Sequence, residues 1–374
     1  MKIEIDPIIP VKDGSCEKDL CRYVPAYAFR KTHLEYGFFY QCYWGIICKL
    51  ISLTAKTRLM ALGARYKKYS ADSELDNGEI ERIYLREAGT YEKKHHLTTN
   101  FRDRWWRRQA GMDVISYAMK AQKKNVPVVL LDIAAGVGAS IQEMFEMFKL
   151  FDVDVVATAL DYNESMLMQA RSVTLPRMKT AGLIEPGKRE VLFVKGDARR
   201  LSAASHSANG YTTFPSGSID CITITFGIGG IDCPITSFEE QLIVLKPNGI
   251  VALKDMHRPI MEIDEQWPIF IDHKRPSSFS YFAWEKVTKP VILRTLWGWR
   301  DPTYLYYILP LITARDPESG KYYGFELESF SIDTEFWWLK SPVISTAHSI
   351  VRKVEIDRNE SDNRRRLFDR INIQ

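Results

Sequence analysis

Runs of apolar residues recur through the middle of the chain, separated by segments in which apolar residues fall at three- and four-residue spacing. The runs predict strands at 126–133, 153–160, 191–194, 219–225 and 250–253. The spaced segments predict helices around 141–148, at 165–175 and at 238–245. Strands that are apolar throughout and alternate with helices are typical of a parallel sheet covered on both faces. We therefore expect an α/β fold with a doubly wound, mostly parallel sheet.

This alternation occupies only part of the chain and divides it into sections. We expect a core at 89–258, completed by a late strand at 341–354. An N-terminal helical extension precedes the core at 1–88. Residues 259–340 are dense in aromatic residues and proline, so we expect an insertion that caps the ligand site. The charged section 355–374 is expected to be a flexible tail.

The N-terminal extension contains an apolar segment, YGFFYQCYWGIICKLISLTA, at 36–55. Its uncharged stretch, 36–48, has 13 residues, whereas about 20 are needed to span a bilayer. We expect a helix that is either buried in the protein or lies at a membrane surface. Peripheral membrane contact through 36–55 is therefore left open.

Charge and cysteine usage narrow the class of protein only a little. The formal net charge of +4 is too weak to indicate a nucleic-acid partner. The six cysteines have no metal-ligand spacing, so we expect free thiols and no metal site. No secretory signal is recognised at the start of the chain, which favours a cytoplasmic protein, with membrane association and a homodimer both left open.

The first predicted strand runs directly into a turn of small residues. In LDIAAGVG, Asp132 near the strand end is followed by Ala134, Ala135, Gly136 and Gly138. Small residues let a ligand approach the backbone, and the start of the next helix offers N–H groups. The spacing differs from Gly-x-Gly-x-x-Gly and so fits a dinucleotide site poorly. A carboxylate before the turn would repel a pyrophosphate and attract a cationic ligand.

Polar residues also stand at the ends of the next three strands. Asp161, followed by Tyr162, ends the second strand, Asp197 and Ala198 follow the third, and Thr225 ends the fourth. Because open parallel sheets bind ligands at the carboxyl ends of their strands, we expect these residues to gather along one edge. There, the carboxylate of Asp161 can accept hydrogen bonds from the hydroxyls of a ribose, and the carboxylate of Asp197 can accept one from the amino group of an adenine.

Five motifs together resemble a known family: LDIAAGVG, ALDYNESML, VKGDARRL, IDCITITFGIGGI and LKPNGIVALKDM. They look like a class I methyltransferase and are most similar to the ubiquinone/menaquinone-biosynthesis C-methyltransferase family. The segment AGTYEKKHHLTTNFRDRWWRR at 88–108 is similar to the stretch that precedes an Arg/Trp-rich helix in that family. The resemblance covers roughly residues 88–255 and the strand near 343–352, and it implies a Rossmann-like sheet of seven strands.

The resemblance also implies a cofactor and a kind of substrate. The cofactor would be S-adenosylmethionine, and the acceptor a bulky apolar or aromatic molecule, quinol-like or lipid-like, methylated on carbon or oxygen. Carried over by motif, Asp132, Ala134 and Gly136 would line the methionine part of the cofactor, Asp161 the ribose, and Asp197 and Ala198 the adenine.

Groups that act on the acceptor are less clearly marked in the sequence. A nucleophile that must lose a proton needs a base, and the candidates are His257, after the fifth strand, and His95. Tyr91 would close over the site. The chain departs from the family where Gly229 and Gly230 replace the usual Arg and Asn, and where His95 replaces an Asn. These departures keep two alternatives open, a phospholipid N-methyltransferase and a catalytically inactive protein that binds the cofactor.

Overall fold

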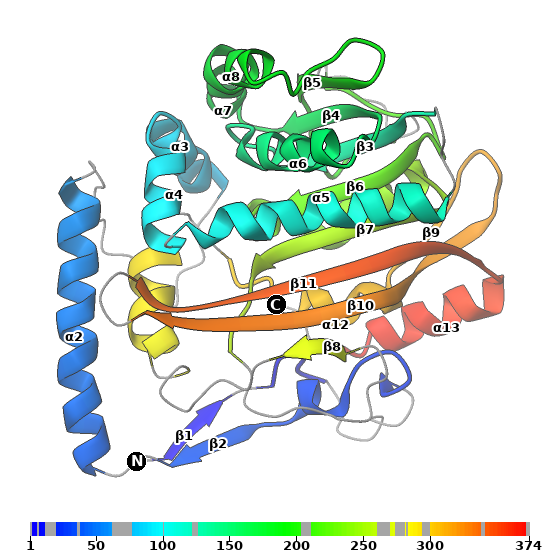
Figure 1. Cartoon of the computed structure of the whole chain (residues 1–374). Coiled ribbons are helices and arrows are strands. Elements are labelled where there is room, and N and C mark those ends of the chain that lie inside the picture. The colour runs from blue at the N-terminus through cyan, green and yellow to red at the C-terminus, as the bar shows by residue number, and fades with distance from the viewer. Residues whose placement is uncertain are drawn as a thin grey trace.

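One mixed sheet organises the chain in the computed structural model (Figure 1). The structure describes residues 2–5, 7–11, 20–35, 38–61, 77–99, 101–121, 126–202, 211–259, 270–273, 281, 283–293, 300–337 and 341–371. The five strands expected from the apolar runs are parallel neighbours in the order β5-β4-β3-β6-β7. Their bounds are β3 Val128–Ile133, β4 Val155–Asp161, β5 Arg189–Lys195, β6 Ile219–Thr225 and β7 Leu245–Met256.

Four further strands extend the sheet beyond β7. β11 runs antiparallel to β7, β10 runs antiparallel to β11, and β8 lies parallel to β10, while the short β9 pairs with one end of β10. Their bounds are β8 Phe270–His273, β9 Thr313–Arg315, β10 Tyr322–Trp337 and β11 Ser341–Ile356. The α/β class and the mostly parallel sheet are confirmed, but eight strands stand in the row, with β9 beside them, rather than seven.

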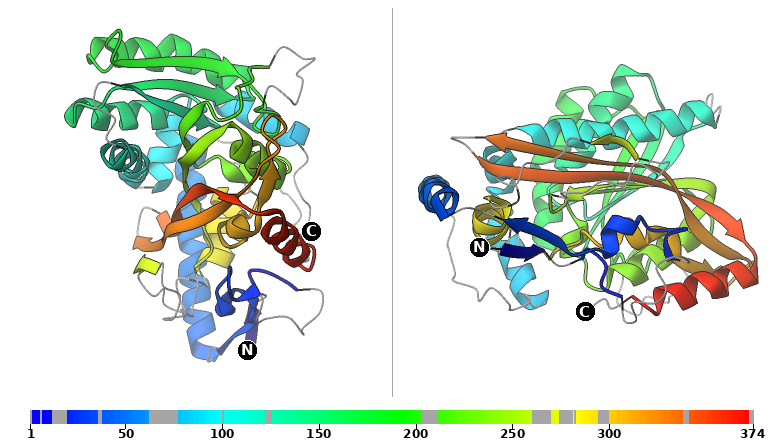
Figure 2. Two further views of the ribbon diagram at one scale, coloured as in Figure 1. Left: turned by 90° about the vertical axis from the view of Figure 1, so that its right-hand side faces the viewer. Right: turned by 90° about the horizontal axis from the view of Figure 1, so that it is seen from below.

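Helices cover both faces of this sheet (Figure 2). On one face α5 and α6 pack closely, which glycine at position 111 of α5 permits: an added Cβ there would lie only 3.2 Å from the Cα of Met144 in α6. The other face holds α9, α12 and α13 together with buried residues of the N-terminal segment. The helical bounds are α5 Arg102–Lys120, α6 Ala139–Leu150, α7 Glu164–Gln169, α8 Leu175–Thr180, α9 Pro234–Val244, α12 Leu305–Ile308 and α13 Arg358–Phe368.

The expected tail and insertion both differ from the structure. The section 355–374 contains α13, which is packed and not flexible: Leu367 is buried, and Arg364 donates to the backbone oxygens of Pro310 and Phe325. The section 259–340 contributes β10 to the sheet, so it is not simply a cap. Its described aromatic residues include Tyr306 and Tyr307, which are buried in the core on the α9 face.

The N-terminal extension is only partly helical. A two-stranded sheet of β1 (Lys2–Ile5) and β2 (Thr32–Glu35) encloses a short 3₁₀ turn, η1 (Ala26–Phe29). Three helices follow: α2 (Phe38–Ala61), α3 (Asn77–Glu87) and α4 (Tyr91–Thr99). Among the helices that the structure describes, none is long and apolar enough to cross a membrane.

Candidate active site

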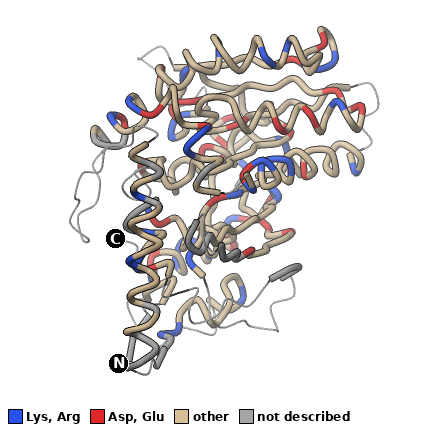
Figure 3. The backbone as a smooth tube through the Cα atoms, turned by 60° about the vertical axis from the view of Figure 1, so that its left-hand side comes forward, with Lys and Arg blue, Asp and Glu red and all other residues tan. Residues whose placement is uncertain are grey.

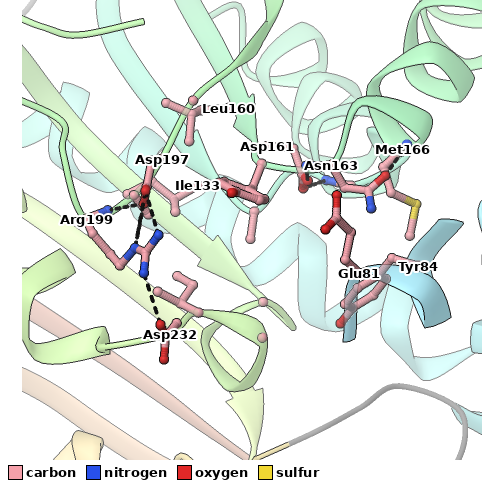
Figure 4. Close-up of a pocket in the computed structure, with 18 of the residues that line it drawn as sticks. Glu81, Tyr84, Ile133, Leu160, Asp161, Asn163, Met166, Asp197, Arg199 and Asp232 are labelled. Carbon is pink, nitrogen blue, oxygen red and sulfur yellow. Dashed lines mark hydrogen bonds and ion pairs between the residues drawn. The ribbon is translucent and has the colours of Figure 1, made fainter. Parts of the chain in front are cut away.

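A cavity of about 220 Å³ lies at the carboxyl ends of β3, β4, β5 and β6. Residues that follow these strands form one side of it, and residues of α3 and α4 form the opposite side (Figure 4). Of the residues expected to bind a ligand, six line the cavity: Ala134, Gly136, Asp161, Tyr162, Asp197 and Ala198. Tyr91, which was expected to close over the site, lines it as well.

The turn after β3 brings the backbone to the cavity wall. Ala134 and Gly136 both have positive φ angles, +58° and +56°, which is unusual for the alanine and permitted for the glycine. No atom stands within 4 Å of the place where a Cβ of Gly136 would lie, so its backbone faces open space. An added Cβ at Gly227, after β6, would lie 2.4 Å from the Cβ of Ala134. Small residues at both strand ends therefore keep the cavity open.

Asp161 ties the end of β4 to this turn. Its Oδ2 accepts the Gly136 N–H at 2.7 Å, and its Oδ1 accepts the Asn163 N–H at 2.8 Å. Burial raises the pKa of Asp161, and these backbone N–H groups oppose the rise. The Tyr162 N–H also acts on this carboxyl group, and the lone pairs that remain can accept hydrogen bonds from hydroxyl groups in the cavity.

Asp197 belongs to a chain of charges at the other end of the cavity. Arg199 donates to both Asp197 oxygens and, at 3.0 Å, to Asp232 (Figure 4). Burial acts to raise the pKa of Asp197, but the hydrogen bonds from Arg199 hold it below its ordinary value. An adenine amino group at this position would therefore share Asp197 with Arg199.

Helix α3 supplies wall residues that the sequence analysis missed. Gly78, Glu81 and Tyr84 all line the cavity, and their three-residue spacing puts them on one helix face. The ring centroid of Tyr84 lies 6.4 Å from that of Tyr91. An added Cβ at Gly230 would lie 3.5 Å from the Tyr84 hydroxyl. Where the family usually has Asn, this chain therefore has a glycine, and Tyr84 forms the cavity wall beside it. The sequence spacing in α3 does predict that these residues share a helix face, but the neighbouring sequence does not indicate which face of the helix lies against the cavity.

The charge of the cavity favours a cation. Four carboxylates line it, those of Glu81, Asp161, Asp197 and Asp232, against the single guanidinium of Arg199. The described residues contain no group of three His, Cys, Asp or Glu side chains that could hold a metal ion. The lining therefore offers an organic cation both charge and hydrogen-bond acceptors.

Buried polar atoms near the ends of β3 and β6 lack partners. Asp132 accepts from Thr223 at 2.7 Å through Oδ1, but its Oδ2 has no hydrogen-bond partner among the described residues. Burial raises its pKa to about 7, while Thr223 and Arg107 oppose the rise. Thr225 Oγ1 and Arg107 Nε are also buried without a hydrogen-bond partner among the described residues. Asp132 and Thr225 do not themselves line the cavity.

Behind the Tyr91 wall lies a histidine held by a carboxylate. The His95 ring packs between those of Tyr91 and Phe226, with centroids 5.6 and 5.0 Å away, and both neighbours line the cavity. Its Nδ1 lies 3.4 Å from Asp103 Oδ2. Burial lowers the pKa of His95, with Asp103 acting against it. Burial therefore favours the neutral form of His95, which lies one layer behind the wall.

The same Asp103 carboxylate also pairs with His96, whose pKa is raised whereas that of His95 is lowered. His96 Nδ1 lies 2.9 Å from Asp103 Oδ2, and hydrogen bonds to Asp103 and Glu92 raise the pKa of His96 to about 9. Burial would raise the pKa of Asp103, but the two histidines and Arg107 keep it far below its usual range. The carboxylate is thus permanently charged beneath the cavity wall.

His257 does not line the cavity, contrary to expectation for a base. It is fully buried, its Nδ1 lies 2.6 Å from the backbone oxygen of Arg258, and its Nε2 lies 3.2 Å from the Tyr307 hydroxyl. Tyr306 and Phe330 pack against its ring. Both ring nitrogens are engaged inside a closed aromatic cluster, so we do not retain His257 as a base.

The two remaining predicted residues support the turn from behind. Ala135 donates its N–H to the backbone oxygen of Leu160 at 3.0 Å, which joins the ends of β3 and β4. Gly138 caps α6 with a φ of +81°, and an added Cβ would lie 2.9 Å from the Phe193 ring of β5. Both residues shape the turn without touching the cavity.

Comparison with known proteins gives consistent matches. The ubiE/COQ5 methyltransferase family matches residues 73–286. A demethylmenaquinone methyltransferase of Staphylococcus aureus strain MRSA252 is 23% identical over 197 residues, which cover 52% of this chain and 68% of the relative. A ubiquinone/menaquinone biosynthesis C-methyltransferase, UbiE, of Pseudomonas fluorescens strain Pf0-1 is 25% identical over 181 residues, covering 48% of this chain and 59% of the relative.

Solved structures show a more distant likeness. A phosphoethanolamine N-methyltransferase of Haemonchus contortus, in complex with phosphoethanolamine and S-adenosylhomocysteine, is 15% identical. The alignment covers 79% of this chain and 54% of that one, with a TM-score of 0.41.

Proposed function

Because the chain belongs to the ubiE/COQ5 methyltransferase family and is an S-adenosylmethionine-dependent methyltransferase, we propose that it methylates a carbon of a bulky, quinol-like aromatic acceptor. The motif resemblance to this family is confirmed. The observation that carries the proposal is the composition of the cavity. Asp161, Asp197 and Asp232 make the part of the cavity beyond β4, β5 and β6 mainly acidic. The rings of Tyr84 in α3, Tyr91 in α4 and Phe226 after β6 make another part of it aromatic.

The acidic side fits the cofactor. Asp161, beside the open backbone of Gly136, would hold the ribose hydroxyls, and Asp197 with Ala198 would hold the adenine. At the methionine end, Ala134 and Gly136 would line the cofactor, and the buried carboxyl group of Asp132 behind them would favour its positive charge without touching it. The bound cofactor supplies a methyl group attached to a positively charged sulfur.

The aromatic side fits a flat, apolar acceptor. Tyr84, Tyr91 and Phe226 offer ring surfaces, and aromatic rings pair favourably in offset or tilted arrangements. Burial raises the pKa of Tyr91 to about 12, so its hydroxyl stays protonated and can donate to an oxygen of the acceptor. The cation of Arg107 lies 5.7 Å from the Phe226 ring centroid and favours a negative charge developing nearby.

His95 positions Tyr91 in this proposal. With Asp103 ionised, Nδ1 of His95 carries the proton that faces the carboxylate, and the ring is fixed against both Tyr91 and Phe226. A quinol hydroxyl that loses its proton makes the adjacent ring carbon a stronger nucleophile. That carbon forms the new C–C bond as the C–S bond breaks, which leaves S-adenosylhomocysteine and a ring ketone. The ring carbon then loses its hydrogen to water as a proton while the oxygen takes one up, so the net release is the single proton that the hydroxyl first gave to solvent. Holding the two reacting atoms in line supplies a large share of the rate.

A bulky apolar acceptor partitions into lipid, so peripheral contact with a membrane through residues 36–55 is part of the proposal. A direct methyl-transfer assay identifies the acceptor. Purified protein is incubated with methyl-labelled S-adenosylmethionine and, separately, demethylmenaquinol or phosphatidylethanolamine. We expect labelled menaquinol whose methylated ring can still be oxidised to the quinone, which a phenol ether cannot. Label in the phospholipid would favour headgroup N-methylation, and cofactor binding without transfer to either acceptor would favour an inactive protein.

A further inference from the structure

Helix α2 presents an apolar face that the rest of the described chain leaves uncovered. Tyr43, Ile46, Leu50, Leu53 and Met60 are each 52–64% exposed. They recur at alternating spacings of three and four residues, with Thr57 in the one polar position, so they form a single stripe along the helix. The helix has 24 residues, which corresponds to a length of about 36 Å. A continuous exposed apolar stripe of this length marks an interaction surface.

A basic groove runs beside this stripe. The groove, of about 510 Å³, is lined by Lys49 and Lys56 of α2 and by Lys286, with Leu53 shared between groove and stripe. Lys286 belongs to η5 (Trp284–Leu293), the π-helix that packs next to α2. In Figure 2 the two helices lie side by side at one edge of the molecule. Three ammonium groups therefore face the groove from two elements.

In the part of the chain that the structure describes, no acidic side chain pairs with these lysines. The α2 sequence contains no Asp or Glu, and its coloured segments in Figure 3 are those of Lys and Arg. A second copy of this helix would bring the same positive charge against them, whereas an anionic surface would neutralise them.

We propose that α2 and the groove form a docking surface for an anionic phospholipid bilayer. The stripe enters the boundary between headgroups and acyl chains, as exposed apolar residues of an interfacial helix do. The three lysines bind the phosphates of the headgroups. The inference extends the proposed membrane contact by naming the lipid charge and the residues, and it does not require that the acceptor be a quinol.

Vesicle sedimentation tests the proposal with the full chain. The vesicles are phosphatidylcholine alone, or phosphatidylcholine with phosphatidylglycerol in equal parts. We expect binding to the anionic vesicles that weakens with added salt. Each lysine near an anionic surface contributes about fivefold in affinity, so K49Q/K56Q/K286Q should bind on the order of 100-fold more weakly. The matched control is K179Q, which changes an exposed lysine on α8.

The stripe has its own variant and control. I46S/L50S should weaken vesicle binding about tenfold or more, because two exposed apolar side chains lose their lipid contact. Leu150→Ser changes an equally exposed apolar residue on α6 and should leave binding unchanged. All these variants should transfer methyl groups at the parent rate to an acceptor dispersed in detergent, which separates failure of docking from failure of the proposed chemistry.

Two results would overturn the proposal. One is equal binding of the parent and the triple lysine variant to anionic vesicles. The other is absence of vesicle binding together with a dimer in analytical ultracentrifugation that I46S/L50S dissociates, since the stripe would then be covered by a second copy of the chain.

Discussion

Two aromatic regions of the molecule differ in what they surround. Tyr306 and Tyr307 lie with His257 and Phe330 in a closed cluster on the α9 face of the sheet, where their rings contact one another. Tyr84 and Tyr91 stand across open space from the ends of β3 and β4. Both regions combine aromatic rings with a histidine, but only the second lines a cavity together with acidic residues from the strand ends. The ends of the parallel strands, and not aromatic density, locate the site.

The largest expected effect belongs to the closed cluster. Tyr306→Ala removes a buried ring whose hydroxyl donates to the backbone oxygen of Ala347. It should lower the free energy of unfolding by about 3–5 kcal/mol, the usual cost of truncating a buried aromatic residue. Urea unfolding measures this loss. The comparison breaks if Tyr306→Ala leaves stability intact and instead reduces methyl transfer.

Next in size is the effect of removing the carboxylate at the end of β4. Asp161→Ala should weaken S-adenosylmethionine binding about 10- to 100-fold, because charged hydrogen bonds are worth about 1.5–3 kcal/mol. Isothermal titration measures the dissociation constant. Asp357→Ala is the matched control, since this carboxylate also accepts a backbone N–H, that of Glu360, but caps the distant α13. Equal affinities for parent and Asp161→Ala would contradict the ribose assignment.

A smaller effect depends on pH and concerns the ion pair of His96 with Asp103, which lies behind the cavity wall formed by Tyr91. The pKa of His96 is raised to about 9 in the folded protein, against about 6.5 when unfolded. Its stabilising contribution is therefore complete below pH 6.5 and is lost as the pH rises through 9. Because His96 is half-buried and solvent screens its pair with Asp103, the parent's free energy of unfolding, measured relative to that of His96→Asn, should fall by about 1–2 kcal/mol between these pH values. A pH-independent difference between the two proteins would rule out the charged pair with Asp103.

The smallest expected effect is that of removing one tyrosine hydroxyl from the cavity, compared with removing one from the closed cluster. Tyr91→Phe should lower kcat about fivefold while leaving cofactor affinity unchanged, because one hydrogen bond to the acceptor is worth about 1 kcal/mol. Tyr27→Phe removes a hydroxyl bonded to Tyr307 in the closed cluster and should change stability but not kcat. Steady-state kinetics on both variants would contradict the assignment if their effects on kcat were reversed.

The positioning role of His95 has a variant of its own. His95→Asn restores the residue usual in the family and should retain most of kcat, whereas His95→Ala should lower it. A merely structural His95 would make the two variants equally active when both are fully folded.

The strand ends are readable in the sequence because their signals are local. The runs of β3 and β6 are buried on both faces, whereas β4 and β5 also carry exposed residues. In each case the polar residue that follows the run reaches the same end of the sheet, because the strands are parallel. The sequence is therefore sufficient to place Asp161 and Asp197 at that edge. It is not sufficient for the residues of α3, because only tertiary packing decides which face of a short helix meets the cavity.

The late part of the chain is harder to predict, also for a physical reason. The expectation of a cap at β10 was wrong because this strand lacks a continuous apolar run. As an antiparallel strand it alternates instead: Phe325 and Leu327 are buried while Glu326 and Glu328 are exposed. Period-two alternation is the signal of such a strand, and the density of aromatic residues obscures it. His257 was expected near a ligand because it follows the fifth strand, whereas it lies in the closed core.

The most direct test of the account is a crystal structure of the protein with S-adenosylhomocysteine. The account predicts the nucleoside in the cavity between α3 and the strand ends, with its ribose hydroxyls on Asp161 and its sulfur facing Tyr91 and Phe226. A nucleoside bound at any other place, or in this cavity with its ribose turned away from Asp161, would contradict it.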